Sequence, residues 1–406
     1  MTKEKENTAQ ETDVAPPWRS TLFVMFIAQL LSIIGFAFVL PFIPFYIREI
    51  GVMDEKLVPV WAGIMMAASS LTMTIFAPFW GWLSDRYGRK LMVERAMFAG
   101  AIITIAMGMI SNVYQLLVLR LLAGAFTGTI SASLALVSSV LPGAKLGFGL
   151  GLMQVGVFLG MSVGPLIGGV IADIVGYRLT FVAGGVMLLL GGLLVLFGTK
   201  EKFIRPSAAS LKQNANIRTL FTLPGFVALM LVFLLFNFSI HIAIPIIPLF
   251  IEEVGNLKTN VASTTGLLLA VTGATASISA AAIGYLSDRM GHKKVLIVNL
   301  FITGILWIIH ALARNIDQLL VIRIIFGFAV GGNIPTMNAL LGKITPKENY
   351  GKAYGWMASM TSLGMTLGPL MGGVMASYMG LRWPLIAVSI LLTLVVIPII
   401  MSLKTR

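Results

Sequence analysis

The sequence predicts an all-α membrane protein whose twelve transmembrane helices form two pseudo-symmetric six-helix bundles. Composition is the first observation: 57% of the 406 residues are hydrophobic and 11% are charged, whereas an average soluble domain has about 25% charged residues. A soluble fold could not hide that much apolar surface from water. The other two observations are a series of twelve long apolar runs and a repeat that relates the two halves of the chain.

The apolar runs are each long enough to cross the hydrocarbon core, which needs about 20 helical residues. Most connecting loops are short, so consecutive helices should be antiparallel neighbours. The first run follows a polar tail and is too long for a cleaved signal, so we expect it to be retained. The expected spans are 20–47, 58–84, 91–110, 113–140, 147–173, 177–197, 220–250, 261–286, 294–313, 317–342, 351–377 and 381–403.

The basic residues predict which side of the membrane each loop faces. If both termini lie on one side, 21 of the 29 Lys and Arg residues fall on that side and six on the other. Loops rich in Lys and Arg stay in the cytoplasm, so we expect both termini and the linker at 199–219 to be cytoplasmic. The net charge of +13 then reflects membrane orientation, and we expect no nucleic-acid partner. The six residues of the outer loops are Arg48, Lys56, Arg178, Lys258, Arg314 and Arg382.

The second half of the chain repeats the first at a shift of 203 to 204 residues. A nearly constant shift over the whole length predicts two six-helix units of the same topology, as in transporters built from parallel repeats. We therefore expect a cytoplasmic tail at 1–19, one bundle at 20–198, a linker at 199–219 and a second bundle with a short tail at 220–406. Matching pairs include Pro41 and Pro245, Pro44 and Pro248, Asp85 and Asp288, Arg120 and Arg323, Pro165 and Pro369, and Arg178 and Arg382.

Four motifs in the order and on the helices expected of one family cover the chain from about Ser20 to Leu403. They are the loop GWLSDRYGRK (Gly81–Lys90), the segment Arg120–Gly128, the glycine-rich Gly160–Gly169, and Leu40, Pro41 and Pro44. With these motifs the chain resembles the twelve-helix drug:proton antiporter branch of the major facilitator superfamily. The resemblance implies the major facilitator fold and export of drug-like compounds in exchange for protons.

The loop at Gly81–Lys90 and its second copy carry the predicted conformational latch. Glycine permits close backbone approach or a positive φ, and a carboxylate at a helix N-terminus gains about 0.3–2 kcal/mol. By resemblance, Asp85 locks one conformation against helix 11. A solvated Asp in an ordinary cytoplasmic turn is the alternative. The predicted latch residues are Gly81, Asp85, Arg86, Gly88, Arg89, Asp288 and Arg289.

The glycine-rich pattern of helix 5 recurs in helix 11 and predicts close helix packing. Small residues four apart let another helix lie close, and a proline bends a helix because it removes one backbone hydrogen bond. By resemblance this antiporter motif forms a flexible seam between the halves; tight packing alone is the alternative. Its residues are Gly160, Gly164, Pro165, Gly168 and Gly169, repeated at Gly364, Gly368, Pro369, Gly372 and Gly373.

No Asp or Glu lies near the middle of any expected span, so the proton carrier is open. The candidates for the carrier are Asp85, Glu94 and His241, of which only the histidine has an ordinary pKa near neutrality. By resemblance, Arg120 has a role in proton coupling. It lies about 10 Å deep, where a charge usually faces a cavity or a partner, although it could also extend to the interface. A hydrogen-bonded structural histidine is the alternative for His241.

The substrate cavity is expected at mid-depth between the halves. Flexible Met and Phe surfaces suit promiscuous binding, and the lack of a mid-depth acid argues against strict selection of cations. The cavity candidates, any of which could instead be plain packing residues, are Gln29, Phe36, Gln154, Asn237, His241, Asn333 and Asn338.

Taken together, these features predict a proton-coupled exporter of small amphipathic compounds, a monomer that works by alternating access. The chain has no cysteine and three scattered histidines, so we expect no metal, no cofactor and no catalytic residues. No nucleotide-binding loop is present, which argues against ATP as the energy source. A nutrient uniporter or symporter, for example for a sugar, and a lipid flippase or membrane enzyme on the same bundle remain alternatives.

Overall fold

The computed structural model describes residues 18–142, 145–201, 218–346 and 349–402. The predicted cytoplasmic tail up to residue 17, the linker at 202–217 and the last four residues therefore lie outside the described part. Within that part the chain is helical along all twelve expected spans, and nine helical stretches are both long and apolar enough to cross a membrane.

Eight of the expected spans are single helices. Their bounds agree with the expected ones to within a few residues, because apolar length and the flanking glycines define them in the sequence. These helices are α3 (Leu57–Tyr87), α4 (Arg89–Met107), α7 (Leu146–Val175), α8 (Tyr177–Gly198), α12 (Val261–Met290), α13 (His292–Ala311), α16 (Tyr350–Met379) and α17 (Arg382–Ser402).

The other four expected spans are each interrupted, so that each is built from shorter helices. The first span is divided into α1 (Trp18–Ala37), a 3-10 turn and α2 (Ile43–Glu49), because Pro41 and Pro44 supply no backbone N–H groups. The seventh span breaks in the same way near Pro245. The remaining pieces are α5 (Val113–Phe126), α6 (Thr129–Val140), α9 (Arg218–Phe221), α10 (Phe226–Ala243), α11 (Ile247–Gly255), α14 (Ile316–Val330) and α15 (Asn333–Ile344).

The break between α5 and α6 shows how the fold satisfies the backbone groups that a broken helix leaves free. Gly128 has a φ of 106°, which ends the α5 geometry. The Nε1 of Trp80 donates to the carbonyl of Ala125 at 2.6 Å, and an Nη of Arg95 donates to the carbonyl of Phe126 at 2.6 Å. Irregular backbone is tolerated within a membrane only where such partners exist.

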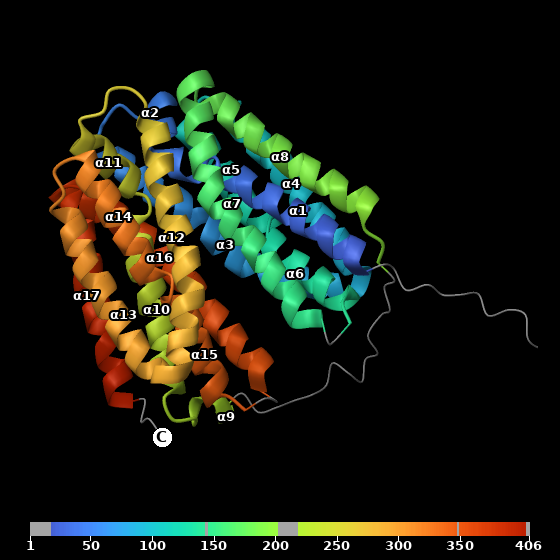
Figure 1. Ribbon diagram of the computed structural model, residues 1–406. Helices are drawn as coiled ribbons and strands as arrows, with labels where there is room; N and C mark the ends of the chain where they lie inside the picture. Colours follow the sequence, from blue (N-terminus) through green and yellow to red (C-terminus); the bar gives the residue numbers. More distant parts are fainter. Residues whose placement is uncertain (1–17, 143–144, 202–217, 347–348, 403–406) are drawn as a thin grey trace, which may run out of the picture.

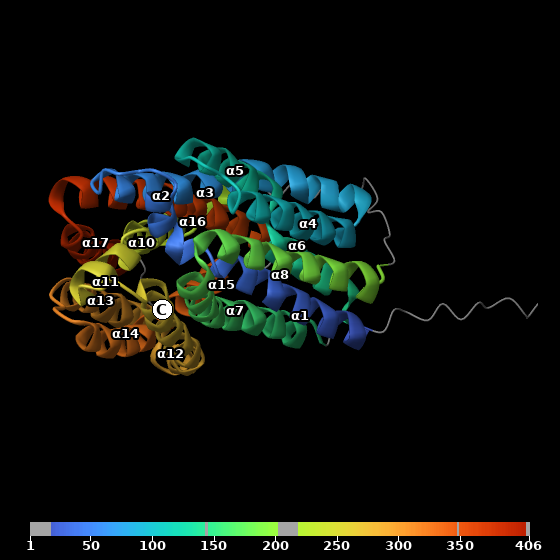
Figure 2. The ribbon, with the colours of Figure 1, turned by 90° about the horizontal axis from the view of Figure 1, so that it is seen from above.

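The two halves lie side by side, α1 to α8 in one and α10 to α17 in the other (Figures 1 and 2). They meet along two seams, α7 against α12 and α3 against α16. Figure 1 shows the halves converging at the end that carries α2 and α11, which we call the α2/α11 end. They diverge at the end that carries the start of α1, the end of α17 and α9, which we call the linker end.

Glycines make the two seams tight near the α2/α11 end. A Cβ on Gly169 would lie 2.8 Å from the carbonyl carbon of Ala262. A Cβ on Gly373 would lie 3.1 Å from that of Pro59. Because these neighbours are backbone atoms, no side chain can move aside. The two seams are built from equivalent residues, so the repeat found in the sequence is also a repeat of contacts between the halves.

Candidate transport site

The first copy of the charged loop is tied down within its own half. Gly88, with a φ of 102°, ends α3 and starts α4. The backbone amides of Arg89 and Lys90 donate to the two carboxylate oxygens of Glu201 at 3.0 and 2.7 Å. The ammonium of Lys90 donates to the carbonyl of Thr199 at 2.7 Å. Glu201 therefore caps α4 and joins it to the end of α8, a role that sequence reasoning missed.

The side chain of the predicted latch residue Asp85 lies outside the described part of the structure. Its neighbour Arg86 is exposed, and its guanidinium carbon lies 5.6 Å from the ring of Trp82 and 5.7 Å from that of Tyr87. A Cβ on Gly81 would meet nothing within 4 Å. The latch function of this loop stays a prediction.

The second copy of the loop has its own internal contacts. The side chain of Asp288 is 72% exposed, and one of its oxygens lies 3.8 Å from Nε2 of His292. The Nδ1 of that histidine lies 2.9 Å from the hydroxyl of Ser287. Arg289 lies over the ring of Tyr285 at 4.5 Å. None of these contacts crosses to the other half, as expected at an end where the halves diverge.

The glycine motif of α7 packs against helices of both halves. Gly160 and Gly164 pack against α1, where a Cβ would lie 2.6 Å from Ile33 and 2.5 Å from Ala37. Farther along, Gly169 contacts α12 in the other half. In α16, Gly368 packs against α10 within its half and Gly373 contacts α3. The motif thus combines close packing inside each half with close packing between the halves.

The two arginines inside helices are buried and lack acidic partners among the described residues. Arg120 is 7% exposed and Arg323 is 3% exposed. The hydroxyl of Ser69 donates to the carbonyl of Arg120 at 2.9 Å, which fixes its backbone against α3. The guanidinium of Arg323 lies 6.0 Å from the ring of Phe326. Arg120 therefore lies within the protein and not in an exposed position at the interface.

The other two candidates for proton coupling have local partners. Glu94 lies 3.5 Å from the ammonium of Lys90, one turn earlier on α4. The Nδ1 of His241 lies 2.7 Å from the carbonyl of Asn237 on its own helix. This contact agrees with a hydrogen-bonded bundle histidine, the alternative that the sequence left open.

The seven cavity candidates do not come together as one group. Gln29 is 1% exposed, and neither atom of its amide has a hydrogen-bond partner. Phe36 extends toward Gly100 inside the first half, while Asn333 donates to Thr303 inside the second at 3.2 Å. Asn237 donates to Thr361 of α16 at 3.4 Å, one turn from His241. The two remaining candidates are Gln154, which is exposed, and Asn338, which is half-buried.

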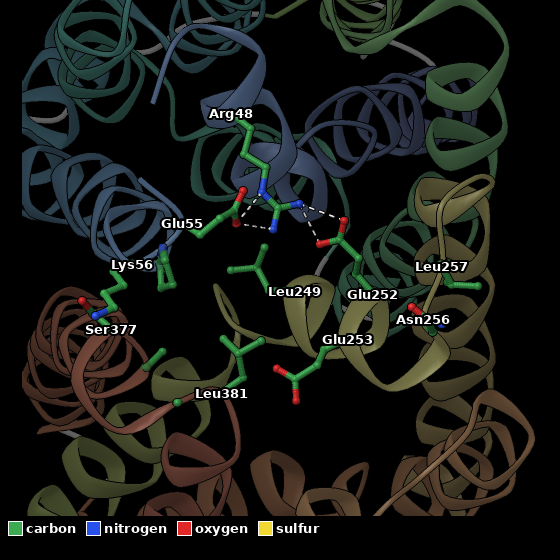
Figure 3. Close-up of a pocket in the computed structure, with 13 residues that line it drawn as sticks. Arg48, Glu55, Lys56, Leu249, Glu252, Glu253, Asn256, Leu257, Ser377 and Leu381 are labelled. Carbon is green, nitrogen blue, oxygen red and sulfur yellow. Dashed lines mark hydrogen bonds and ion pairs between the residues drawn. The ribbon is translucent and has the colours of Figure 1, made fainter. Parts of the chain in front are cut away.

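A group of charged residues at the α2/α11 end links the two halves, and sequence reasoning missed it. One Nη of Arg48 donates to both carboxylate oxygens of Glu252 at 2.9 and 2.7 Å. The Nε and the other Nη of Arg48 donate to Glu55 at 3.0 and 2.7 Å. These residues line a pocket of about 580 Å³ between the halves, and Figure 3 shows Arg48 between the two carboxylates.

The signal for this contact was present in the repeat. Arg48 and Glu252 are 204 residues apart, so they hold the same position in the two halves. Equivalent residues near a pseudo-two-fold axis face each other, and here they carry opposite charges. Because the two residues differ in type, the pair does not stand out among the identical residues that reveal the repeat.

Comparisons with known proteins agree with the fold and the motifs. A family model described as Major Facilitator Superfamily matches residues 25–270 and 256–406. The multidrug resistance proteins MdtG of Salmonella typhimurium and Citrobacter koseri are each 32% identical to this chain over 381 residues, which cover 91% of the chain and 92% of the relative. The resemblance predicted from the motifs, to multidrug efflux proteins of the MdtG type, is confirmed.

Solved structures show the same fold. A bacterial homologue of the human lysosomal transporter Spinster, in an inward-facing and occupied conformation, has a TM-score of 0.79 at 16% identity, covering 95% of this chain and 96% of that one. The human organic anion transporter MFSD10 has a TM-score of 0.67 at 17% identity, covering 95% and 100%. The predicted fold class is confirmed. The chain belongs to the Major Facilitator Superfamily and is a multi-pass membrane transporter for small molecules.

Proposed function

We propose that this protein exports small amphipathic or drug-like compounds across the bacterial cytoplasmic membrane in exchange for protons. The observation that carries the proposal is its identity of 32% with multidrug resistance proteins over 91% of the chain. The region matched to these relatives extends over both halves, so it includes the seams, the loop motifs and the broken helices. The protein acts as a monomer with both termini in the cytoplasm.

The arrangement of the halves supports alternating access. The halves converge at one end and diverge at the other (Figure 1), and the contacts at the converged end include two glycine seams. The basic loops at the linker end support a cytoplasmic position for that end. The described conformation is then open toward the cytoplasm, like the Spinster homologue with which it shares its fold. Rocking of the halves about the seams would expose the substrate on the other side.

The energetics permit useful export with one proton. A potential of 100 mV is worth about 2.3 kcal/mol per charge, and a difference of one pH unit about 1.4 kcal/mol. Their sum supports a gradient of roughly a few hundred-fold for a neutral compound. Arg120 is the strongest candidate for coupling, since it is buried within α5 without an acidic partner among the described residues.

Transport by the purified protein in vesicles tests this function directly. A panel of fluorescent dyes and antibiotics of positive, neutral and negative charge is presented with and without a proton gradient. Export should stop when an uncoupler collapses the gradient, and protons should move against the substrate. Protons moving with a sugar-like substrate would indicate a symporter. Movement of labelled lipid alone would indicate a flippase. Either result would overturn the proposed export.

A further inference from the structure

The α2/α11 end contains direct polar contacts between the halves that no motif of the chain accounts for. The ion pair of Arg48 and Glu252, in which one Nη of Arg48 contacts both carboxylate oxygens, joins α2 to α11. Its side chains are 29% and 26% exposed, so both charges are partly shielded from water. Hydrogen bonds between two charged groups are stronger than those between neutral groups, and partial shielding makes this pair stronger than a fully exposed surface pair. This pair therefore favours the conformation in which the halves meet here.

A second contact crosses the seam between α7 and α12. The carboxylate of Asp173, at the end of α7, accepts hydrogen bonds from the backbone amides of Ala262 at 3.3 Å and Ser263 at 2.8 Å. These amides belong to the first turn of α12, where helices have unpaired N–H groups and a positive end. Farther along the seam, the hydroxyl of Ser162 donates to the carbonyl of Ala270 at 2.8 Å. One half thus supplies the helix cap of the other.

The equivalent seam between α3 and α16 lacks this cap. Ser377 stands where Asp173 stands in the first half, and Pro59 stands where Ala262 stands in the second, because a Cβ on Gly169 would meet Ala262 and one on the equivalent Gly373 would meet Pro59. Proline has no amide hydrogen to donate, and no side chain caps the start of α3. The pocket of about 580 Å³ lies on this side and is lined by both Pro59 and Ser377. The polar closure is therefore one-sided, although the glycine contacts are symmetric.

We propose that the Arg48–Glu252 ion pair and the Asp173 cap of α12 together form a gate that holds the halves closed at the α2/α11 end. Both contacts join residues of different halves, so both must break before that end can open. The gate sets the ratio of the two conformations and the rate of their exchange. The inference rests on the alternating opening in the proposed function and is independent of the substrate and of proton coupling.

The gate makes graded predictions for substitutions. Glu252→Gln removes one charge and should raise the ratio of open to closed conformations at this end roughly 5- to 30-fold. Asp173→Asn should have an effect in the same range. Arg48→Glu should act more strongly, because it would place a carboxylate beside Glu55 and Glu252. The charge swap Arg48→Glu with Glu252→Arg should restore closure, since the new arginine can reach both carboxylates.

Distance measurements between spin labels test these predictions without any transport assay. The chain has no cysteine, so labels can be attached at introduced cysteines alone. One pair, at the exposed Met53 and Lys258, reports on the α2/α11 end. A second, at the exposed Ser138 and Lys343, reports on the linker end. With the gate removed, the first distance should lengthen and the second should shorten in the same molecules.

A matched control is available beside the gate. Glu49 pairs with Arg178 at 3.1 Å, at the same end and with the same chemistry, but within one half. Glu49→Gln should leave both distance distributions as in the wild type. Unchanged distributions in Glu252→Gln and Asp173→Asn, or no recovery in the charge swap, would overturn the gate. A gate that responds as expected in a protein showing no proton-coupled export would instead refute only the proposed function.

Discussion

The tight seam between α7 and α12 predicts that a single methyl group at Gly169 will force the halves apart. In Gly169→Ala the new Cβ would lie 2.8 Å from the carbonyl carbon of Ala262 and 2.9 Å from Cα of Ser263. Ordinary contacts between carbon atoms lie at about 3.5–4.0 Å. The shortfall is roughly 0.6–1.2 Å, and the obstructing atoms are backbone, so the two helices themselves must move.

The magnitude follows from the cost of overpacking. Adding a methylene to a well-packed site costs about 1–3 kcal/mol, and here the cost falls only on the conformation in which the seam is closed. A bias of about 1–3 kcal/mol changes a two-state ratio roughly 5- to 150-fold. Gly169→Ala should therefore populate the conformation that is open at the α2/α11 end. Gly373→Ala, in the equivalent seam, should act in the same direction with a smaller effect, since its closest carbon contacts are 3.1 Å.

The assay is the distance between spin labels on cysteines introduced at positions 53 and 258, measured by pulsed electron paramagnetic resonance in lipid nanodiscs. Gly151→Ala is the matched control, because it lies on the same helix and its Cβ would meet nothing within 4 Å. It should leave the distance unchanged and slightly stabilise α7. A Gly169→Ala protein that folds with the wild-type distance would refute the reasoning, since it would mean that the seam can absorb the methyl group.

Three further predictions concern residues away from the seams. Glu201→Gln should lower thermal stability by about 0.5–2 kcal/mol, because it weakens the cap of α4, whereas Glu253→Gln should change stability by less than about 0.5 kcal/mol; thermal unfolding followed by tryptophan fluorescence checks both. Arg120→Met should raise stability, because it removes a buried charge that lacks an acidic partner, and should reduce vesicle transport at least tenfold; retained transport would exclude a coupling role. Asp288→Asn should leave unfolding unchanged, because its pair with His292 is exposed, and should slow transport several-fold; unchanged transport would contradict the second latch.

The positions of the helices could be predicted because apolar length and the repeat determine them. The ends of α3, α7, α12 and α16 follow from glycines that the sequence displays. The breaks in the first and seventh spans were less predictable, because prolines in membrane helices can either bend or interrupt a helix. The break after α5 depends on Trp80 and Arg95, which lie far away in the sequence and donate hydrogen bonds to the carbonyls that the break leaves free.

The polar contacts could be predicted only in part, because they depend on how helices from different parts of the chain pack. Glu201 lies 111 residues from Lys90, and no local pattern indicates that it caps α4. Asp173 lies at the end of α7, and the amides that it accepts from belong to α12 in the other half. Residues that their depth singled out as cavity candidates, such as Gln29 and Asn333, are buried in separate halves. Spacing along one helix gives depth in the membrane but not the neighbour on the facing helix.

The asymmetry of the closed end leads to a prediction that strengthens closure. Ser377→Asp would place a carboxylate at the position equivalent to Asp173, facing the start of α3, where Pro59 offers no amide but Val60, the equivalent of Ser263, does. One new hydrogen bond to a helix N-terminus is worth about 0.5–2 kcal/mol, so the ratio of closed to open conformations should rise roughly 2- to 30-fold.

Adding Pro59→Ala to Ser377→Asp would supply the second amide, at the position equivalent to Ala262, and recreate both hydrogen bonds of the α7/α12 seam. The double variant should close the α2/α11 end further and slow transport, because each cycle must break the added contact. Label distances at Met53 and Lys258 measure the ratio, and the vesicle assay measures turnover. A larger population of the closed conformation without slower turnover would mean that opening at this end is not rate-limiting. No gain in either variant would mean that the acidic residues of the pocket, Glu252 and Glu253 among them, outweigh the new cap.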